Sequence, residues 1–98
     1  MREVAPSFAR DHGCTVAEWT GWLPAAVHGH ALRLDAGRAE VGLGAGMLQL
    51  SWHPLPPRRI ALLHLPRLLV HYDFVDVDAP TRTRFMTRFD LHIQRGGG

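Results

Sequence analysis

The chain has 98 residues, of which 46% are hydrophobic and 20% are charged. This composition is typical of one globular domain and not of a disordered segment. The chain contains eleven arginines and no lysine. The absence of lysine excludes every chemistry that needs a lysine amine, such as Schiff-base catalysis or a Walker-type phosphate loop. Arginine-only usage is most simply the coding bias of a GC-rich genome, such as that of many bacteria.

The charge is close to balanced, and the cysteine content is minimal. The formal net charge is +2, with seven arginines against four acidic residues after residue 53. This bias is far below the field expected of a DNA-coating protein. Cys14 is the only cysteine, so no disulfide forms within the chain and a reducing compartment is expected. No apolar stretch is long enough for a secretory leader or a membrane span, so we expect a cytoplasmic protein without membrane contact.

The N-terminal region predicts a flexible lead-in followed by a short helix. Residues 1–13 contain no clear periodicity and are interpreted as the lead-in. Thr15 and Glu18 have the spacing of a capping box, in which each side chain bonds the backbone N–H of the other residue. A helix that carries Trp19 and Leu23 should follow, and Pro24 should end it or start a second turn.

The middle of the chain alternates with a period of two. Apolar residues alternate with polar ones or glycine over 32–35, 38–43 and 48–53. Turns are expected at 36–37 and 44–46. This pattern predicts three strands of an antiparallel meander with one buried face.

The next region is apolar on both sides of a predicted strand. We expect strands over 60–65 and 68–77, separated by a bulge or turn at 66–67. A strand that is apolar on both faces must be covered on both. Either the two helices pack on opposite sides of the sheet, or a second copy of the chain covers the outer face. The residues predicted for self-association are Ala61, Leu63, Leu65 and Leu69.

The C-terminal region, residues 78–95, reads best as an amphipathic helix. At 100° per residue, the residues on one arc are Phe85, Met86, Phe89 and Ile93, and those on the other are Arg84, Arg88 and Arg95. A strand over 84–93 fits the alternation too. Asp78 as a cap, Pro80 in the first turn and Gly96 past the end favour the helix. The predicted fold is therefore α+β: a four- or five-stranded antiparallel meander with a short N-terminal helix and a C-terminal helix packed on it. One domain spans 14–95, before a glycine tail at 96–98.

Several side chains could carry chemistry, although none forms a specific motif. His28 and His30 would point to one side of an extended segment, as in a metal chelate, with His64 as a weak third ligand. Residues 71–78 gather a histidine and three aspartates. We interpret Asp78 as a helix cap, Asp76 as solvated and Asp73 as the partner of an arginine, and not as a magnesium or acid–base site. Cys14 lacks a recognisable base and is interpreted as passive. No metal, cofactor or catalytic residue is predicted.

The working hypothesis is a non-catalytic binding or adaptor module that forms a homodimer. The residues expected to contact an acidic protein partner are Arg84, Arg88, Arg95, Arg58 and Arg59. One alternative is a nucleic-acid-binding protein that uses the C-terminal arginine face. It is not favoured, because the predicted strands lack the exposed aromatic residues that single-strand binders use. Another alternative is a small-ligand or metal-binding domain, with or without catalysis, that uses the histidines.

Overall fold

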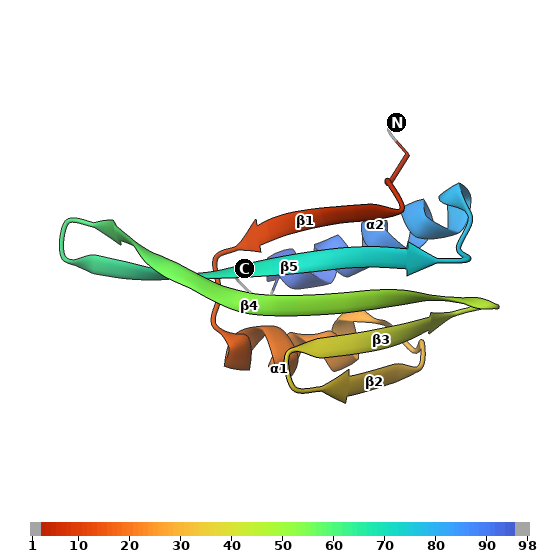
Figure 1. The fold of residues 1–98 in the computed structure, drawn as a ribbon, viewed down its shortest axis with the longest axis horizontal. Helices are drawn as coiled ribbons and strands as arrows, with labels where there is room; N and C mark the ends of the chain where they lie inside the picture. Colours follow the sequence, from red (N-terminus) through yellow and green to blue (C-terminus); the bar gives the residue numbers. More distant parts are fainter. Residues whose placement is uncertain (1–2, 96–98) are drawn as a thin grey trace.

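The structure is a computed structural model that describes residues 3–95, without the side chain of Arg95. One antiparallel sheet of five strands, in the order β1-β5-β4-β3-β2, carries both helices on one face (Figure 1). The elements are β1 (Ser7–His12), α1 (Val16–Ala26), β2 (Leu32–Asp35), β3 (Arg38–Leu43), β4 (Gly46–Ile60), β5 (Leu63–Val75) and α2 (Ala79–Arg95). The predicted α+β class, with one antiparallel sheet, a short N-terminal helix and a C-terminal helix, is confirmed.

Helix α1 begins at the predicted capping box. The N–H of Glu18 donates to Thr15 Oγ1 at 3.1 Å, and the N–H of Thr15 donates to Glu18 Oε1 at 2.9 Å. Trp19 and Leu23 are fully buried between the helix and the sheet. Pro24 does not end the helix as the sequence indicated, because the helix continues to Ala26 with the proline inside it.

The meander of β2, β3 and the first half of β4 follows the predicted alternation. Strand β3 pairs antiparallel with β2 on one side and with β4 on the other, so that Val41 lies opposite both Leu32 and Leu48. Leu48, Leu50 and Trp52 point to the helix side and are buried. The opposite side of the sheet carries no helix (Figure 1). We call the two sides the helix side and the open side.

Strand β1 replaces the lead-in that the sequence predicted for residues 1–13. It pairs antiparallel with β5, with Phe8 opposite Tyr72 and the two rings stacked at 4.7 Å. On the helix side this strand presents Phe8, Arg10 and His12. Two of these three are polar, so the alternation of apolar and polar residues that identifies a strand is missing.

The strands after the meander differ most from the prediction. The turn is at Ala61-Leu62, where β4 ends at Ile60 and β5 begins at Leu63. Residues 66–67, where a bulge or turn was predicted, lie inside β5. No turn forms there, and the ladder shifts its register on the facing strand, between Leu55 and Arg58, across from Pro66. The segment predicted as one strand over 60–65 is therefore the tip of a long hairpin, which projects past the helices (Figure 1).

Helix α2 closes the core. The N–H of Thr81 donates to Asp78 Oδ1 at 2.9 Å, which confirms the predicted cap, and Pro80 lies in the first turn. The predicted apolar arc is buried: Phe85, Met86, Phe89 and Ile93. The strand alternative for 84–93 is wrong, and the glycine tail at 96–98 lies outside the described residues.

Candidate functional site

The most unusual feature of the surface is the projecting end of the β4–β5 hairpin, residues 54–67, which we call the arm. It extends beyond both helices and the other strands (Figure 1). Four large aliphatic side chains are exposed on it: Leu62 at 97%, Leu63 at 61%, Ile60 at 51% and Leu65 at 41%. Isolated exposed leucines are common on proteins, but an exposed cluster on one projection is typical of an interaction surface.

The register shows that three of these side chains, Ile60, Leu63 and Leu65, share one face of the arm, whereas Leu62 is in the turn. Ile60 lies opposite Leu63, and Arg58 lies opposite Leu65. Cross-strand partners point to the same side, and so do residues two apart on one strand. The face continues on the open side of the sheet to two half-buried leucines, Leu55 and Leu69. We call this set the apolar arm face: Leu55, Ile60, Leu63, Leu65 and Leu69.

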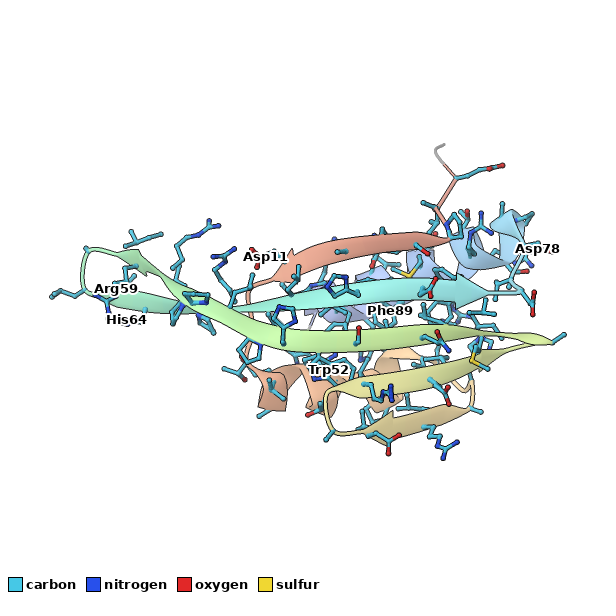
Figure 2. The ribbon with its side chains drawn as sticks, viewed as in Figure 1. Asp11, Trp52, Arg59, His64, Asp78 and Phe89 are labelled. Carbon is cyan, nitrogen blue, oxygen red and sulfur yellow. The ribbon has the colours of Figure 1, made fainter. Side chains whose placement is uncertain are left out.

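The other face of the arm is polar. Arg59 lies opposite His64, and both are exposed. Figure 2 shows these two residues near the end of the arm, far from Trp52 and Phe89 in the body. The arm is therefore an amphipathic hairpin, with the aliphatic groups and Arg58 on its open side and with Arg59 and His64 on its helix side.

Prolines protect the arm from pairing through its edges. The register shifts between Leu55 and Arg58, where Pro56 and Pro57 lie opposite Pro66. Proline has no N–H, so it cannot donate to an added strand, and prolines and bulges are the devices by which proteins block edge pairing. A partner of the arm is therefore expected to contact its side chains and not to extend its sheet.

An ion pair fixes the base of the arm on the open side. Arg67 Nε donates to Asp11 Oδ2 of β1 at 2.9 Å. The Arg67 guanidinium, by hydrogen bond and charge, holds the pKa of Asp11 below its usual value. Of the ion pairs between described residues, none involves Arg58 or Arg59. Arg58 acts on Asp11 through its charge, which also lowers the pKa of that carboxyl, but neither guanidinium is held in an ion pair.

The structure places the predicted self-association residues as follows. Leu63 and Leu65 are exposed on the apolar arm face, Leu69 lies half-buried at its base, and Ala61 is in the turn with a φ of 54°. The premise of a strand apolar on both faces is wrong, because the turn at 61–62 folds Ile60 onto the same face as Leu63. Neither helix covers that face, and both lie on the opposite side (Figure 1).

The predicted arginine surface is divided between two places. Arg84 and Arg88 are exposed on α2, whereas Arg58 and Arg59 are on the arm. Arg59 and Asp78, the cap of α2, lie at opposite ends of the molecule (Figure 2). Arg95 is in α2, but its side chain lies outside the described residues. The two groups of arginines could not be separated from the sequence, because the turn of the hairpin was predicted at the wrong residues.

The predicted histidine ligands do not converge. The rings of His28 and His30 are 5.1 Å apart, and both lie against Phe85 of α2. Burial, followed by the charge of Arg88, lowers the pKa of His28. His64 is on the arm. Within residues 3–95, no group of three or more His, Cys, Asp or Glu side chains has the arrangement of a metal site.

The open side of the sheet carries a broad polar depression of about 790 Å³ that the sequence did not reveal. Side chains from all five strands line it, among them Ser7, Glu40, Ser51, His71 and Asp73. Ser7 donates to Asp73 at 2.6 Å, and the rings of His53 and His71 stack at 6.2 Å. Opposite charges are mixed across this floor, and it favours no single ligand.

In the described part of the chain, the side chains that could act in catalysis are buried or bonded to neighbouring elements. Cys14 is buried, and burial raises the pKa of its thiol to about 11, which disfavours the reactive thiolate at neutral pH. His12 Nε2 lies 2.8 Å from the hydroxyl of Tyr72, under α1 and α2. Arg10 lies over the rings of Phe8 and Tyr72 and pairs with Asp90 at 2.6 Å. These groups join β1 and β5 to α2.

Comparison with known proteins gives no relative. No family model, no curated protein and no solved structure matches the chain. Between residues 3 and 95, neither helix combines the length and the apolar character that crossing a bilayer requires.

Proposed function

We propose that this chain is a non-catalytic binding module that self-associates as a homodimer through the apolar arm face. The observation that carries the proposal is the aliphatic cluster on a hairpin that no helix covers. Burial of aliphatic surface contributes about 25 cal/mol per Å². The large exposed apolar residues of the body are spread over four different elements, at Val16, Leu34, Val75 and Leu91, so the arm is the place where association gains most.

A second copy is the occupant that best fits this face. Aliphatic side chains on one face of a two-stranded ribbon can pack against the same side chains related by a two-fold axis, and such isologous contacts are the commonest in oligomers. The blocked edges favour this closed contact over the open-ended addition of strands. A stable interface buries about 800 Å² per partner. The arm is small on this scale, so we expect a dimer whose population depends on concentration.

The test measures the mass of the protein by sedimentation velocity over a concentration series from about 1 to about 100 µM. The wild type is expected to shift from monomer to dimer. Leu63→Arg should remain monomeric, because it places a charge in the contact. Since Leu63 is exposed in the monomer, the variant should keep the circular dichroism of the wild type. Its melting temperature should equal that of the wild type at low concentration, where the wild type is monomeric.

The matched control is Leu91→Arg, which changes a 53% exposed leucine on α2. It introduces the same side chain far from the apolar arm face and should leave the dimer intact. A wild type that is monomeric at every concentration would overturn the proposal. So would a Leu63→Arg variant that still dimerises, or a Leu91→Arg variant that does not.

A further inference from the structure

The positive charge of the chain is concentrated in the hairpin that forms the arm. Residues 41–72 contain three arginines and no acidic residue, which gives +3, whereas the remainder has eight arginines and nine acidic residues, which gives −1. In the structure, these 32 residues are the end of β3, all of β4 and most of β5. The chain therefore has a near-neutral body and a cationic projection.

Two of the three arginines are free to contact a partner. Arg67 is held by Asp11 at the base. Arg58 and Arg59 are exposed and adjacent on β4, whose outer edge in the arm has no neighbouring strand. Neighbouring residues on a strand point to opposite faces, so the two guanidinium groups lie on either side of this edge. With His64 opposite Arg59 they form the basic edge: Arg58, Arg59 and His64.

We infer that the basic edge binds the phosphate backbone of double-stranded nucleic acid. The inference rests on the proposed dimer. When the apolar faces of two arms pack together, Arg59 and His64 stay on the outside. Arg58 shares its face with Leu65, and from the unpaired edge of β4 its long side chain can extend past the contact to solvent. The dimer then presents two such edges on one projection, and this doubles the number of phosphates that it can contact.

The chemistry of the edge favours phosphate over an acidic protein surface. An interface between proteins needs buried aromatic or aliphatic anchors, and exposed ion pairs alone contribute little to its affinity. The basic edge has no such anchor. On nucleic acid, by contrast, charge alone supplies affinity, because each neutralised phosphate releases condensed counterions. The planar guanidinium also matches phosphate oxygens with two parallel hydrogen bonds.

The same residues predict how the duplex would be contacted. The arm contains no Asn or Gln to read adenine and no Phe, Tyr or Trp to stack on unpaired bases. Binding should therefore prefer a duplex to a single strand and should be independent of base sequence. Phosphate contacts position a protein on nucleic acid without reading bases.

The experiment measures fluorescence anisotropy of a labelled 20-base-pair DNA duplex of mixed sequence, titrated with the full chain. Salt is varied from about 50 to about 200 mM. The wild type should bind, and its affinity should fall linearly in the log–log plot against salt. Arg58→Ala/Arg59→Ala should weaken binding at 50 mM by at least about tenfold. It should also lower the salt slope by about two for each arm in contact.

The matched control is Arg84→Ala/Arg88→Ala, which removes the same number of charges from the exposed face of α2. It should bind nearly as the wild type does, because the effect depends on location and not on net charge. The inference is overturned if the wild type does not bind the duplex at 50 mM. It is also overturned if the α2 variant loses as much affinity as the arm variant, or if the arm variant binds normally.

The mass of each variant, measured in the same buffers, separates this inference from the dimer. Arg58 lies on the same side of the arm as the apolar arm face, so like charges oppose association, and salt should strengthen the dimer while it weakens duplex binding. A dimer without duplex binding would refute only the basic edge. A monomer that binds the duplex through Arg58 and Arg59 would refute the dimer and leave the edge as a monomeric site.

Discussion

The β4–β5 hairpin runs from the body into the arm, and its leucines are mostly buried in the body but mostly exposed in the arm. In the body, Leu48 and Leu50 of β4 are almost completely buried. In the arm, Leu62 and Leu63 are mostly exposed. The strands are continuous between the two regions, and what differs is the layer of helices, which covers only the body (Figure 1).

The difference shows that a strand pairing can extend past the core that stabilises it. Within the arm, order comes from the β4–β5 ladder and from the prolines at the register shift, which restrict the backbone. The aliphatic side chains there contribute nothing to the core of their own chain. They are therefore available for association, and the effects of substitutions should divide sharply between the two regions.

The largest expected effect is the loss of Phe89 in the body. Its ring packs against Phe85, Trp19 and Tyr72 at centroid distances of 5.5 to 6.1 Å. Phe89→Ala should lower the free energy of unfolding by about 3–5 kcal/mol, through lost burial and the cavity that remains. Chemical denaturation at low protein concentration measures it. The control in the arm, Leu62→Ala, should change the free energy of unfolding by less than about 0.5 kcal/mol. Similar losses of stability in the two variants would contradict the division between body and arm.

A smaller effect is expected at the turn between β3 and β4. A Cβ on Gly46 would overlap the carbonyl oxygens of Val75 and Asp76, so the strand could accept it only by moving. Gly46→Ala should cost about 1–3 kcal/mol of unfolding free energy, as overpacking does elsewhere. Gly21→Ala in α1 is the matched control, because nothing lies near its added methyl group. That control should be neutral or stabilising.

The cap of α2 should contribute less. Asp78→Ala removes the acceptor of the Thr81 N–H and should lower the free energy of unfolding by about 1 kcal/mol. Asp78→Asn keeps an oxygen acceptor and should restore most of the loss. Thermal melts of the two variants at pH 7 make the comparison. Equal melting temperatures for both variants would show that the cap does not matter.

The smallest effect is a dependence on pH through His12. Burial, followed by the charge of Arg10, lowers the pKa of this residue from 6.5. The unfolded chain therefore binds more protons below about pH 6.5, so this stability is present above that pH and is lost as the pH falls toward the folded-state pKa. His12→Gln should flatten the decline in melting temperature between pH 7.5 and 5. A variant that declines as steeply as the wild type would contradict this role.

The fold could be predicted from the sequence where neighbouring residues form a recognisable local pattern, and not elsewhere. The meander and both helices were predictable, because alternation, the Thr15–Glu18 box and the Asp78 cap are local signals. Strand β1 was missed because Arg10 and His12 point toward the helices, where apolar residues are expected. The turn at 61–62 has no glycine or asparagine, and Ala61 takes a positive φ that alanine rarely adopts.

The candidate site was predictable in composition and not in arrangement. The aliphatic run over 60–65 indicated an exposed contact surface, yet its residues could be assigned to a face only after the hairpin was closed. The basic edge was hidden for the same reason, since Arg58 and Arg59 were grouped with the arginines of α2. Which residues share a face of the arm depends on the register of the two strands. The two residues of this turn have weak turn preferences, so the sequence does not predict that register.

The most direct test of the central claim is a chain without the arm. Leu55 and Arg67 are paired across the ladder, so residues 56–66 can be replaced by Asn-Gly, which favours a tight hairpin turn. Sedimentation velocity and near-ultraviolet circular dichroism of this variant give its mass and the packing of its tryptophans. We expect a folded monomer at concentrations where the full chain is a dimer. A folded dimer would place the contact elsewhere, and an unfolded chain would show that the arm belongs to the core; either result would contradict the account.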